Sequence, residues 1–251
     1  MTLLKVKTGG RAWAMAIVGV SVATMTGCME LAEAQTPQAS VAKPAGTHAY
    51  TRENTALLIV DPYNDFMTEG GKLYQRTLPT ATDVGFYENM RKLVPAARGA
   101  GVPVFIVPHH KAEKGDYENW YAVTSSQKGA GASMLFGNGT WGAEWNAEFG
   151  PKPGDTIVKE HWAQSGFANT DLDQQLKQHG IRNVIVVGFL ANTCVESTGR
   201  FAMELGYHVT MVKDATAAFS KEAMQAAELN APTYAHAVMT TEELLKALPK
   251  S

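Results

Sequence analysis

From Thr55 onward, short apolar runs alternate with stretches of helical periodicity, and this alternation limits the fold more than any other feature. Most runs are continuously apolar, as is typical of parallel strands covered on both faces. Repeated strand–helix units imply right-handed crossovers. We therefore predict an α/β fold with a doubly wound, mostly parallel six-stranded sheet and helices on both faces, a Rossmann-type three-layer arrangement. The expected strands are 55–60, 102–107, 155–158, 183–187, 207–212 and 235–240, and the expected helices lie near 84–100, 171–179, 193–205, 220–230 and 241–248.

Residues 109–154 break the alternation and are rich in Gly, Asn and Trp. A long irregular segment in a compact domain usually has a function, often as a cover over an active site. Trp120, Trp141 and Trp145 lie in it. They form either an aromatic lid over a substrate or a packing surface for a second subunit, and the sequence leaves both readings open.

The N-terminal segment has the features of an export signal. A basic stretch ending at Arg11 precedes AWAMAIVGVSVATM, which is too short to span a bilayer. Small residues before Gln35 predict cleavage to a soluble protein, whereas MTGC, ending at Cys28, resembles a lipobox and predicts a lipid anchor there. Either route places the protein in the periplasm or cell envelope. The expected division is a signal over 1–34 (1–27 in a lipoprotein), a flexible linker over 35–52 and a single folded domain over 53–251.

The charge and cysteine content narrow the classes of function. The formal net charge is −2 and there is no basic run, so nucleic-acid binding has no support and a small molecule is the expected partner. Membrane contact is expected only through a lipid anchor at Cys28. On either processing route Cys194 is the one cysteine left with a free thiol, so a disulfide framework is excluded. An unpaired thiol in an oxidising compartment is a liability, which favours a use for it.

Three reactive residues follow the ends of expected strands: Asp61, Lys159 and Cys194. Each alone is more often a turn residue, a solvated charge or core filler. In an open α/β sheet, however, binding sites form beyond the carboxyl ends of the strands, where these three residues converge. A thiol in the first turn of a helix, near a lysine, favours the thiolate. Asp61 is then the proton acceptor, and backbone N–H groups of the GFLANTC turn hold an oxyanion.

These residues lie in motifs that resemble those of the isochorismatase-like cysteine hydrolases, which include nicotinamidases, N-carbamoylsarcosine amidases and ureidoacrylate amidohydrolases. The matching stretches are LLIVDPYNDF, VKEHWAQSGFANTDLDQQLKQHGI, VIVVGFLANTCVESTGRFAMELGYHV and VKDATAAF, and they extend over about residues 55–245 in the family's order. The resemblance implies an isochorismatase-like fold and hydrolysis of an amide, ureido or carbamoyl C–N bond through a thioester. It also implies an Asp61–Lys159–Cys194 triad, a cis peptide bond before Leu190, and an oxyanion hole formed by the N–H groups of Leu190 and Cys194.

The region after the second strand departs from the nicotinamidase pattern. Nicotinamidases carry an Asp-x-His pattern there that binds a metal, whereas this chain reads VPHHKAEKGD. The side chains of His109 and His110 diverge if the segment is extended, so they cannot readily share one ion. We therefore expect no metal, and we expect no other cofactor. A separate expectation is a homo-oligomer, either a dimer or a tetramer.

Two further departures bear on the substrate pocket. KEHWAQSGF has a longer gap between Lys159 and the Ser-Gly-Phe triplet than many relatives, which places His161 and Trp162 near the pocket. Tyr63 stands where relatives often have Gln, and either narrows the pocket or simply packs. The candidate substrate-binding residues are Tyr63, Phe66, His109, His161 and Trp162.

Two other functions remain open at this stage. The same site would suit hydrolysis of another bond, such as an ester or a vinyl ether. A non-catalytic exported protein that binds a ligand or senses oxidants through Cys194 is the other alternative. On either processing route no second free thiol is left to resolve a sulfenic acid, which counts against the sensing role.

Overall fold

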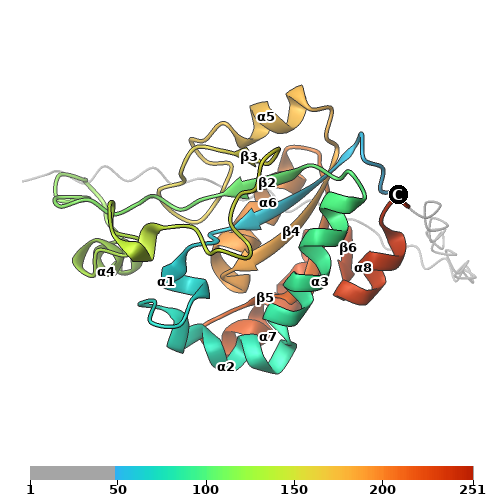
Figure 1. Ribbon diagram of the computed structural model, residues 1–251. Coiled ribbons are helices and arrows are strands. Elements are labelled where there is room, and N and C mark those ends of the chain that lie inside the picture. Colours follow the sequence, from blue (N-terminus) through green and yellow to red (C-terminus); the bar gives the residue numbers. More distant parts are fainter. Residues whose placement is uncertain (1–48, 251) are drawn as a thin grey trace, which may run out of the picture. The chain divides into compact units, whose positions relative to one another are not determined.

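The computed structural model describes residues 49–250. The expected export signal and most of the expected linker lie outside the described residues. The predicted sheet is confirmed: it has six strands, all of its pairings are parallel, and helices cover both faces (Figure 1). The strand order is β3-β2-β1-β4-β5-β6. The strands are β1 (Thr55–Val60), β2 (Val104–Val107), β3 (Thr156–Ile157), β4 (Asn183–Phe189), β5 (His208–Ala217) and β6 (Ala237–Met239).

The expected helices are present, with small shifts of their ends. They are α3 (Phe86–Gly99), α5 (Leu172–Gln178), α6 (Glu196–Glu204), α7 (Lys221–Asn230) and α8 (Thr241–Ala247). A capping box formed by Thr240 and Glu243 begins α8. Three further α-helices lie in segments for which we predicted none: α1 (Asn64–Met67), α2 (Tyr74–Val84) and α4 (Ser125–Ala132).

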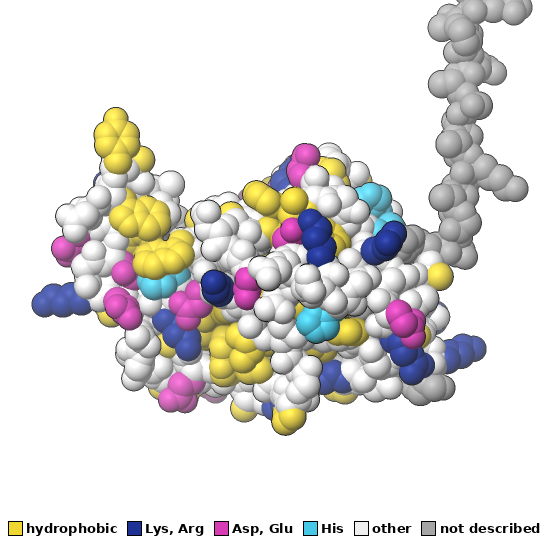
Figure 2. Space-filling view, turned by 90° about the horizontal axis from the view of Figure 1, so that it is seen from above, with side chains coloured by type: hydrophobic (Ala, Val, Ile, Leu, Met, Phe, Trp, Pro, Cys, Tyr) yellow, Lys and Arg dark blue, Asp and Glu magenta, His cyan; other side chains and the backbone are white. Residues whose placement is uncertain are grey.

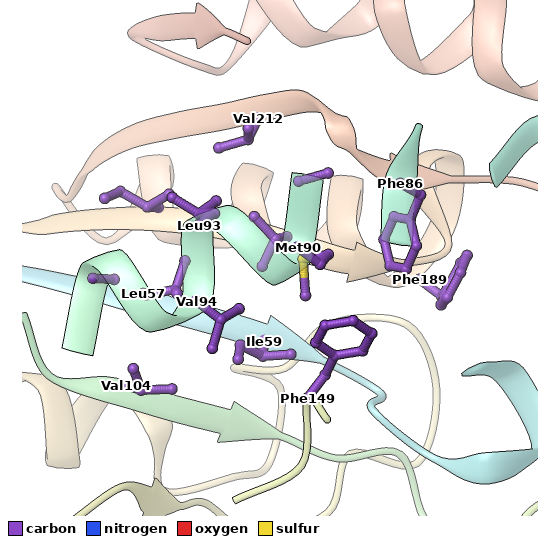
Figure 3. Packing of buried hydrophobic residues seen from close by; sticks show 14 of the residues in the cluster. Leu57, Ile59, Phe86, Met90, Leu93, Val94, Val104, Phe149, Phe189 and Val212 are labelled. Atoms are coloured by element: carbon purple, nitrogen blue, oxygen red, sulfur yellow. The ribbon is translucent and has the colours of Figure 1, made fainter. Parts of the chain in front are cut away.

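Alternate residues of β1 pack into separate cores on the two faces of the sheet. Leu57 and Ile59 pack with Met90 of α3 on one face, and Figure 3 shows α3 side chains directed at the strands. Leu58 packs with Leu176 of α5 on the other face. Every residue of β1 is buried, which explains why the strand is apolar from Ala56 to Val60. Each such aliphatic side chain contributes about 1.5–3 kcal/mol by leaving water.

The chain crosses over on one face of the sheet after β1 and on the opposite face after β4. This change of face determines where a ligand-binding crevice forms. α2 and α3, which follow β1, contribute to one core, and α6, which follows β4, contributes to the other. Because β1 and β4 are neighbours, the crevice at the carboxyl ends of these two strands is the topological switch point, where α/β folds bind ligands. Asp61 follows β1 directly, and Cys194 follows the end of β4 by five residues.

The folded core begins before residue 53, the boundary expected from composition. Tyr50 is buried in the core that includes α3, and its hydroxyl shares a 2.8 Å hydrogen bond with the Thr210 hydroxyl in β5. Between residues 49 and 250, no helix combines the length and apolarity needed to cross a bilayer.

Candidate active site

Asp61 is the first residue beyond β1, and its backbone has an unusual conformation. Its φ is 55°, in the left-handed region that costs most residues free energy. Its N–H donates to the carbonyl of Val107, the last residue of β2, at 3.0 Å, which extends the pairing of the two strands past the end of β1. The side chain is fully buried. Strained residues of this kind cluster at functional sites because the surrounding structure must hold them.

Cys194 lies in a wide helical turn that connects β4 to α6. The peptide bond between Phe189 and Leu190 is cis, as the resemblance implies. A π-helical turn, η2 (Ala191–Val195), follows it, and α6 begins only at Glu196. The sequence predicted an α-helix from residue 193, so the wide turn is a difference from expectation. Such turns occur often at functional sites.

His161 follows β3 in the chain, and its side chain contacts Asp61. Its Nε2 is 3.1 Å from Oδ1 of Asp61, and both side chains are fully buried. One carboxylate oxygen of Asp61, one ring nitrogen of His161 and the sulfur of Cys194 all lie within 4.8 Å of one another. An acid, an imidazole and a thiol thus meet in a water-excluded site at the switch point.

Lys159 does not join this group, which corrects the expected Asp61–Lys159–Cys194 arrangement. Its side chain is exposed, and its backbone N–H donates to Oδ1 of Asp171 at 2.7 Å instead of pairing with β2. Among the described residues, the one basic side chain within ion-pair distance of Asp61 is His161. The position expected for the lysine is therefore taken by a residue two places further along.

The backbone pairing explains how His161 reaches the site. β3 is only two residues long, but its pairing with the β2 side resumes after Lys159 as a parallel bridge between His109 and His161. The His161 N–H donates to the Pro108 carbonyl, and the His110 N–H donates to the His161 carbonyl, both at 2.9 Å. The long gap between Lys159 and the Ser-Gly-Phe triplet was the sequence signal for this arrangement. His161 lies four residues before Ser165.

The surroundings of Cys194 favour the neutral thiol at rest. Burial raises the pKa of the thiol well above its ordinary value, and the charge of Asp61 raises it further. Hydrogen bonds from the Thr193 hydroxyl, 3.9 Å from the sulfur, and from the Leu190 N–H lower this pKa, but as smaller effects. The expectation of a ready-made thiolate is therefore wrong. The thiol must give up its proton as it reacts.

The hydrogen bonds of His161 show where its protons lie. Nδ1 is 3.1 Å from the Ala163 carbonyl, which only accepts, so Nδ1 carries a hydrogen. A hydrogen bond between Nε2 and the Asp61 carboxyl then requires one proton between them, on either group. The pair is an imidazolium with a carboxylate, or an imidazole with a carboxylic acid. In both forms Asp61 and His161 together hold one exchangeable proton.

Two of the expected substrate-binding residues are packing residues. The buried Tyr63 ring stacks between Phe136 and Trp145, with ring centroids 4.8 Å from each, and its hydroxyl donates to the His109 carbonyl at 2.8 Å. Burial raises the Tyr63 pKa far above its ordinary range, so the phenol stays neutral. Phe66 is buried in the core and stacks on Phe189.

The two neighbouring histidines point to different partners, as expected for an extended segment. The His109 ring lies 5.1 Å from the His161 ring, and burial lowers its pKa, so it is a neutral group next to the site. His110 instead bonds to Asp116, at 2.8 Å, and stacks on Trp162 with ring centroids 3.5 Å apart. Trp162 is partly exposed to solvent beside His110.

The three tryptophans of the 109–154 segment do not form one lid. Trp145 packs on Tyr63, whereas Trp120 and Trp141 are each nearly half exposed. A cavity of about 610 Å³ lies within the segment, lined by residues between Glu113 and Met134. Neither Cys194 nor its two partners line this cavity, so its volume does not describe the reactive site.

Comparison with known proteins places this geometry in a family. Residues 55–243 match the model of the isochorismatase domain. The ureidoacrylate amidohydrolase RutB of Rhizobium rhizogenes is 35% identical over 189 residues, which cover 70% of this chain and 76% of that protein. A cysteine hydrolase from Pseudomonas syringae pv. phaseolicola has a similar crystal structure, with a TM-score of 0.69, 27% identity, and coverage of 82% of this chain and 98% of that one. The N-carbamoylsarcosine amidase of Thermoplasma acidophilum has a TM-score of 0.56 and 28% identity, over 75% of this chain and 97% of that one. The chain belongs to the isochorismatase family.

Proposed function

We propose that this protein is a cysteine amidohydrolase that cleaves an amide, ureido or carbamoyl C–N bond of a small molecule through a thioester on Cys194. The observation that supports it is the buried contact of Asp61, His161 and Cys194 at the switch point of the sheet. Asp61 is the proton acceptor and donor in this scheme. His161 supplies the positive charge that we first assigned to Lys159.

The first half of the reaction forms a tetrahedral intermediate on Cys194. As the sulfur of Cys194 attacks the carbonyl carbon, the thiol proton passes to the Asp61 carboxylate, and the His161 imidazolium keeps the site's charge balanced. The negative charge that develops on the carbonyl oxygen is stabilised by the N–H groups of Leu190 and Cys194. The interaction of the Leu190 N–H with the sulfur supports this assignment.

The second half breaks the C–N bond to give the thioester and then hydrolyses it. Asp61 returns its proton to the departing amine nitrogen, and the C–N bond breaks. Water then enters, gives a proton to Asp61 and attacks the thioester, which frees the acid and restores the thiol. In both halves of the reaction the proton moves to or from Asp61, so one carboxylate serves the thiol, the amine nitrogen and the water. The buried surroundings strengthen each of these charge interactions.

The relatives' names suggest where to look for the substrate. One acts on a ureidoacrylate and another on an N-carbamoyl compound, so ureido acids and carbamoyl compounds come first. The face seen in Figure 2 carries Lys, Arg, Asp and Glu side chains in a mixed distribution, which suits a protein that binds a small substrate rather than a polyanion.

Ammonia release from a panel of amides, ureido acids and carbamoyl compounds tests the proposal, and acid release from a set of esters represents other bond types. We expect a carbamoyl or ureido compound to be hydrolysed and Cys194→Ala to lose about 10³-fold or more in kcat, because a nucleophile contributes at least that much. The thermal melt of the variant should match the wild type. Full activity of the alanine variant on the substrate found would refute the thioester.

We also propose that the protein is exported, on the basis of its N-terminal sequence alone. The mature chain then begins at Gln35, or at Cys28 with a lipid attached. Intact-mass measurement on protein from the cell envelope distinguishes these two products. A full-length mass in the cytoplasmic fraction would contradict both.

A further inference from the structure

Asp61, His161 and Cys194 offer the donor atoms that zinc prefers. Zinc in proteins is bound by thiolate sulfur, imidazole nitrogen and carboxylate oxygen, with bonds of about 2.0–2.3 Å that set tetrahedral ligand atoms about 3.3–3.8 Å apart. The three donor atoms here lie within 4.8 Å of one another. The widest separation in the group therefore exceeds that of a zinc-bound set by about 1 Å.

His161 is oriented as metal-binding histidines usually are. Such a histidine donates its other ring N–H to a carbonyl or carboxylate, which fixes the ring and its tautomer. Here Nδ1–H donates to the Ala163 carbonyl at 3.1 Å, and Nε2 faces the group. The lone pair of Nε2 thus becomes available to a metal when the shared proton leaves.

Asp61 gives a second indication that a cation suits this site. Its side chain is fully buried, and apart from the Cys194 thiol, which faces the carboxylate, Oδ2 has no hydrogen-bond partner among the described residues. A buried carboxylate oxygen without a partner is costly, and a cation would satisfy it. In residues 49–250 no lysine or arginine forms an ion pair with Asp61, and Lys159 points to solvent. No fixed positive charge from this part of the chain competes with a metal ion here.

We propose that Asp61, His161 and Cys194 bind zinc reversibly and that zinc blocks hydrolysis by occupying the nucleophile. The inhibitory consequence rests on the proposed function, whereas the binding itself does not. Coordination releases the thiol proton and the proton shared by Asp61 and His161 to solvent, and no electron is transferred. A coordinated sulfur cannot attack a carbonyl, so the metal and the reaction exclude one another.

Cobalt titration of the full-length protein tests the binding without any substrate. Cobalt(II) takes zinc's place in such sites, and a cobalt–thiolate bond gives a strong near-ultraviolet charge-transfer band. We expect one equivalent of cobalt to produce the band and zinc to remove it. Cys194→Ser should abolish it, and His161→Lys should weaken cobalt binding by more than about 100-fold, since loss of an outer partner alone costs about 10–100-fold. His161→Gln serves as a second variant if the lysine variant fails to fold.

A matched control removes the other histidine that contacts carboxylates in this region. His110 bonds to Asp116 and Glu160 outside the group of three, so His110→Gln should keep the band. The proposal is overturned if wild type gives no band, if the band persists in folded His161→Lys and His161→Gln, or if it disappears in His110→Gln.

Zinc inhibition of the hydrolysis completes the test. Once a substrate is known, zinc should inhibit at the stoichiometry found with cobalt, and a chelator should restore the activity in full. Activation by zinc, or loss of activity on chelation, would refute the inhibitory role. If no substrate is hydrolysed, the proposed function fails while the cobalt result still decides the metal site.

Discussion

His161 is the basic residue that contacts Asp61, and its side chain differs from a lysine in one decisive way. A lysine ammonium only donates hydrogen bonds, whereas a ring nitrogen of an imidazole can also accept one. We predict that His161→Gln lowers kcat/KM by about 10²–10⁴-fold, the usual loss when a group that takes part in proton transfer is removed. Lys159→Met should stay near wild type because that side chain is exposed.

Steady-state kinetics on the two variants gives the comparison, with thermal melts to confirm folding. The reverse pattern, an inactive Lys159→Met beside an active His161→Gln, would restore the lysine to the site. His161→Lys is a third variant for this comparison. It should recover part of the activity lost in His161→Gln, because an ammonium at this place replaces the charge of the imidazolium.

Asp61 makes the resting thiol of Cys194 less reactive, but hydrolysis requires Asp61 as the proton acceptor. One variant separates these two effects. Because its negative charge raises the Cys194 pKa, Asp61→Asn should lower that pKa. More of the thiol is then ionised at neutral pH, so alkylation of Cys194 by iodoacetamide should become faster, with its pH midpoint moved down. Hydrolysis should be lost because no proton acceptor remains. Slower alkylation together with lost hydrolysis would mean that Asp61 assists thiolate formation at rest.

The reactive residues were predictable to different degrees. Asp61 and Cys194 follow the long, fully buried strands β1 and β4, whose ends are easily located in the sequence. Lys159 and His161 follow a strand of two residues, and local sequence does not tell where its interrupted pairing resumes. Which side chain turns inward is decided by the Asp171 contact and the His109 bridge, both tertiary interactions.

At the scale of the elements, Gly188 allows β4 to lie close against β1. Its φ is 111°, and a Cβ there would collide with the Val60 carbonyl oxygen, immediately before Asp61. We predict that Gly188→Ala destabilises the fold by about 3 kcal/mol or more, because backbone strain of about 1–3 kcal/mol is joined by the collision. Gly154→Ala is the matched control: its φ is 97°, but nothing lies within 4 Å of the added carbon. Equal losses in chemical denaturation would show that strain alone matters.

The strands were predictable as elements because buried parallel strands leave continuous apolar runs. The helices α2 and α4 were not. α2 contains Pro79 and several threonines, all poor helix formers, and is held by tertiary contacts such as the 3.2 Å hydrogen bond from the Ala218 N–H to the Thr80 hydroxyl. α4 buries no residue and contains two glycines, so it shows no apolar periodicity, and a capping box at Thr124 marks its start.

At the scale of the whole molecule, Tyr50 is part of the core of the folded domain. We predict that a chain beginning at Ala49 keeps the melting temperature and the activity of the full-length protein. A chain beginning at Asn54 removes a buried aromatic ring and its hydrogen bond to Thr210. Burial of such a ring is worth about 3–5 kcal/mol, which corresponds to a fall of roughly 6–20 °C in a domain of this size.

Tyr50→Phe in the longer chain separates the two contributions. It keeps the ring in the core but removes the hydroxyl that bonds to Thr210, and a net hydrogen bond is worth only about 1 kcal/mol. We therefore expect a fall of about 2–4 °C, well short of the loss in the chain that begins at Asn54. If the chain that begins at Asn54 melts at the same temperature as the chain that begins at Ala49, the core does not need Tyr50. The folded domain then begins at residue 53, as the composition predicts.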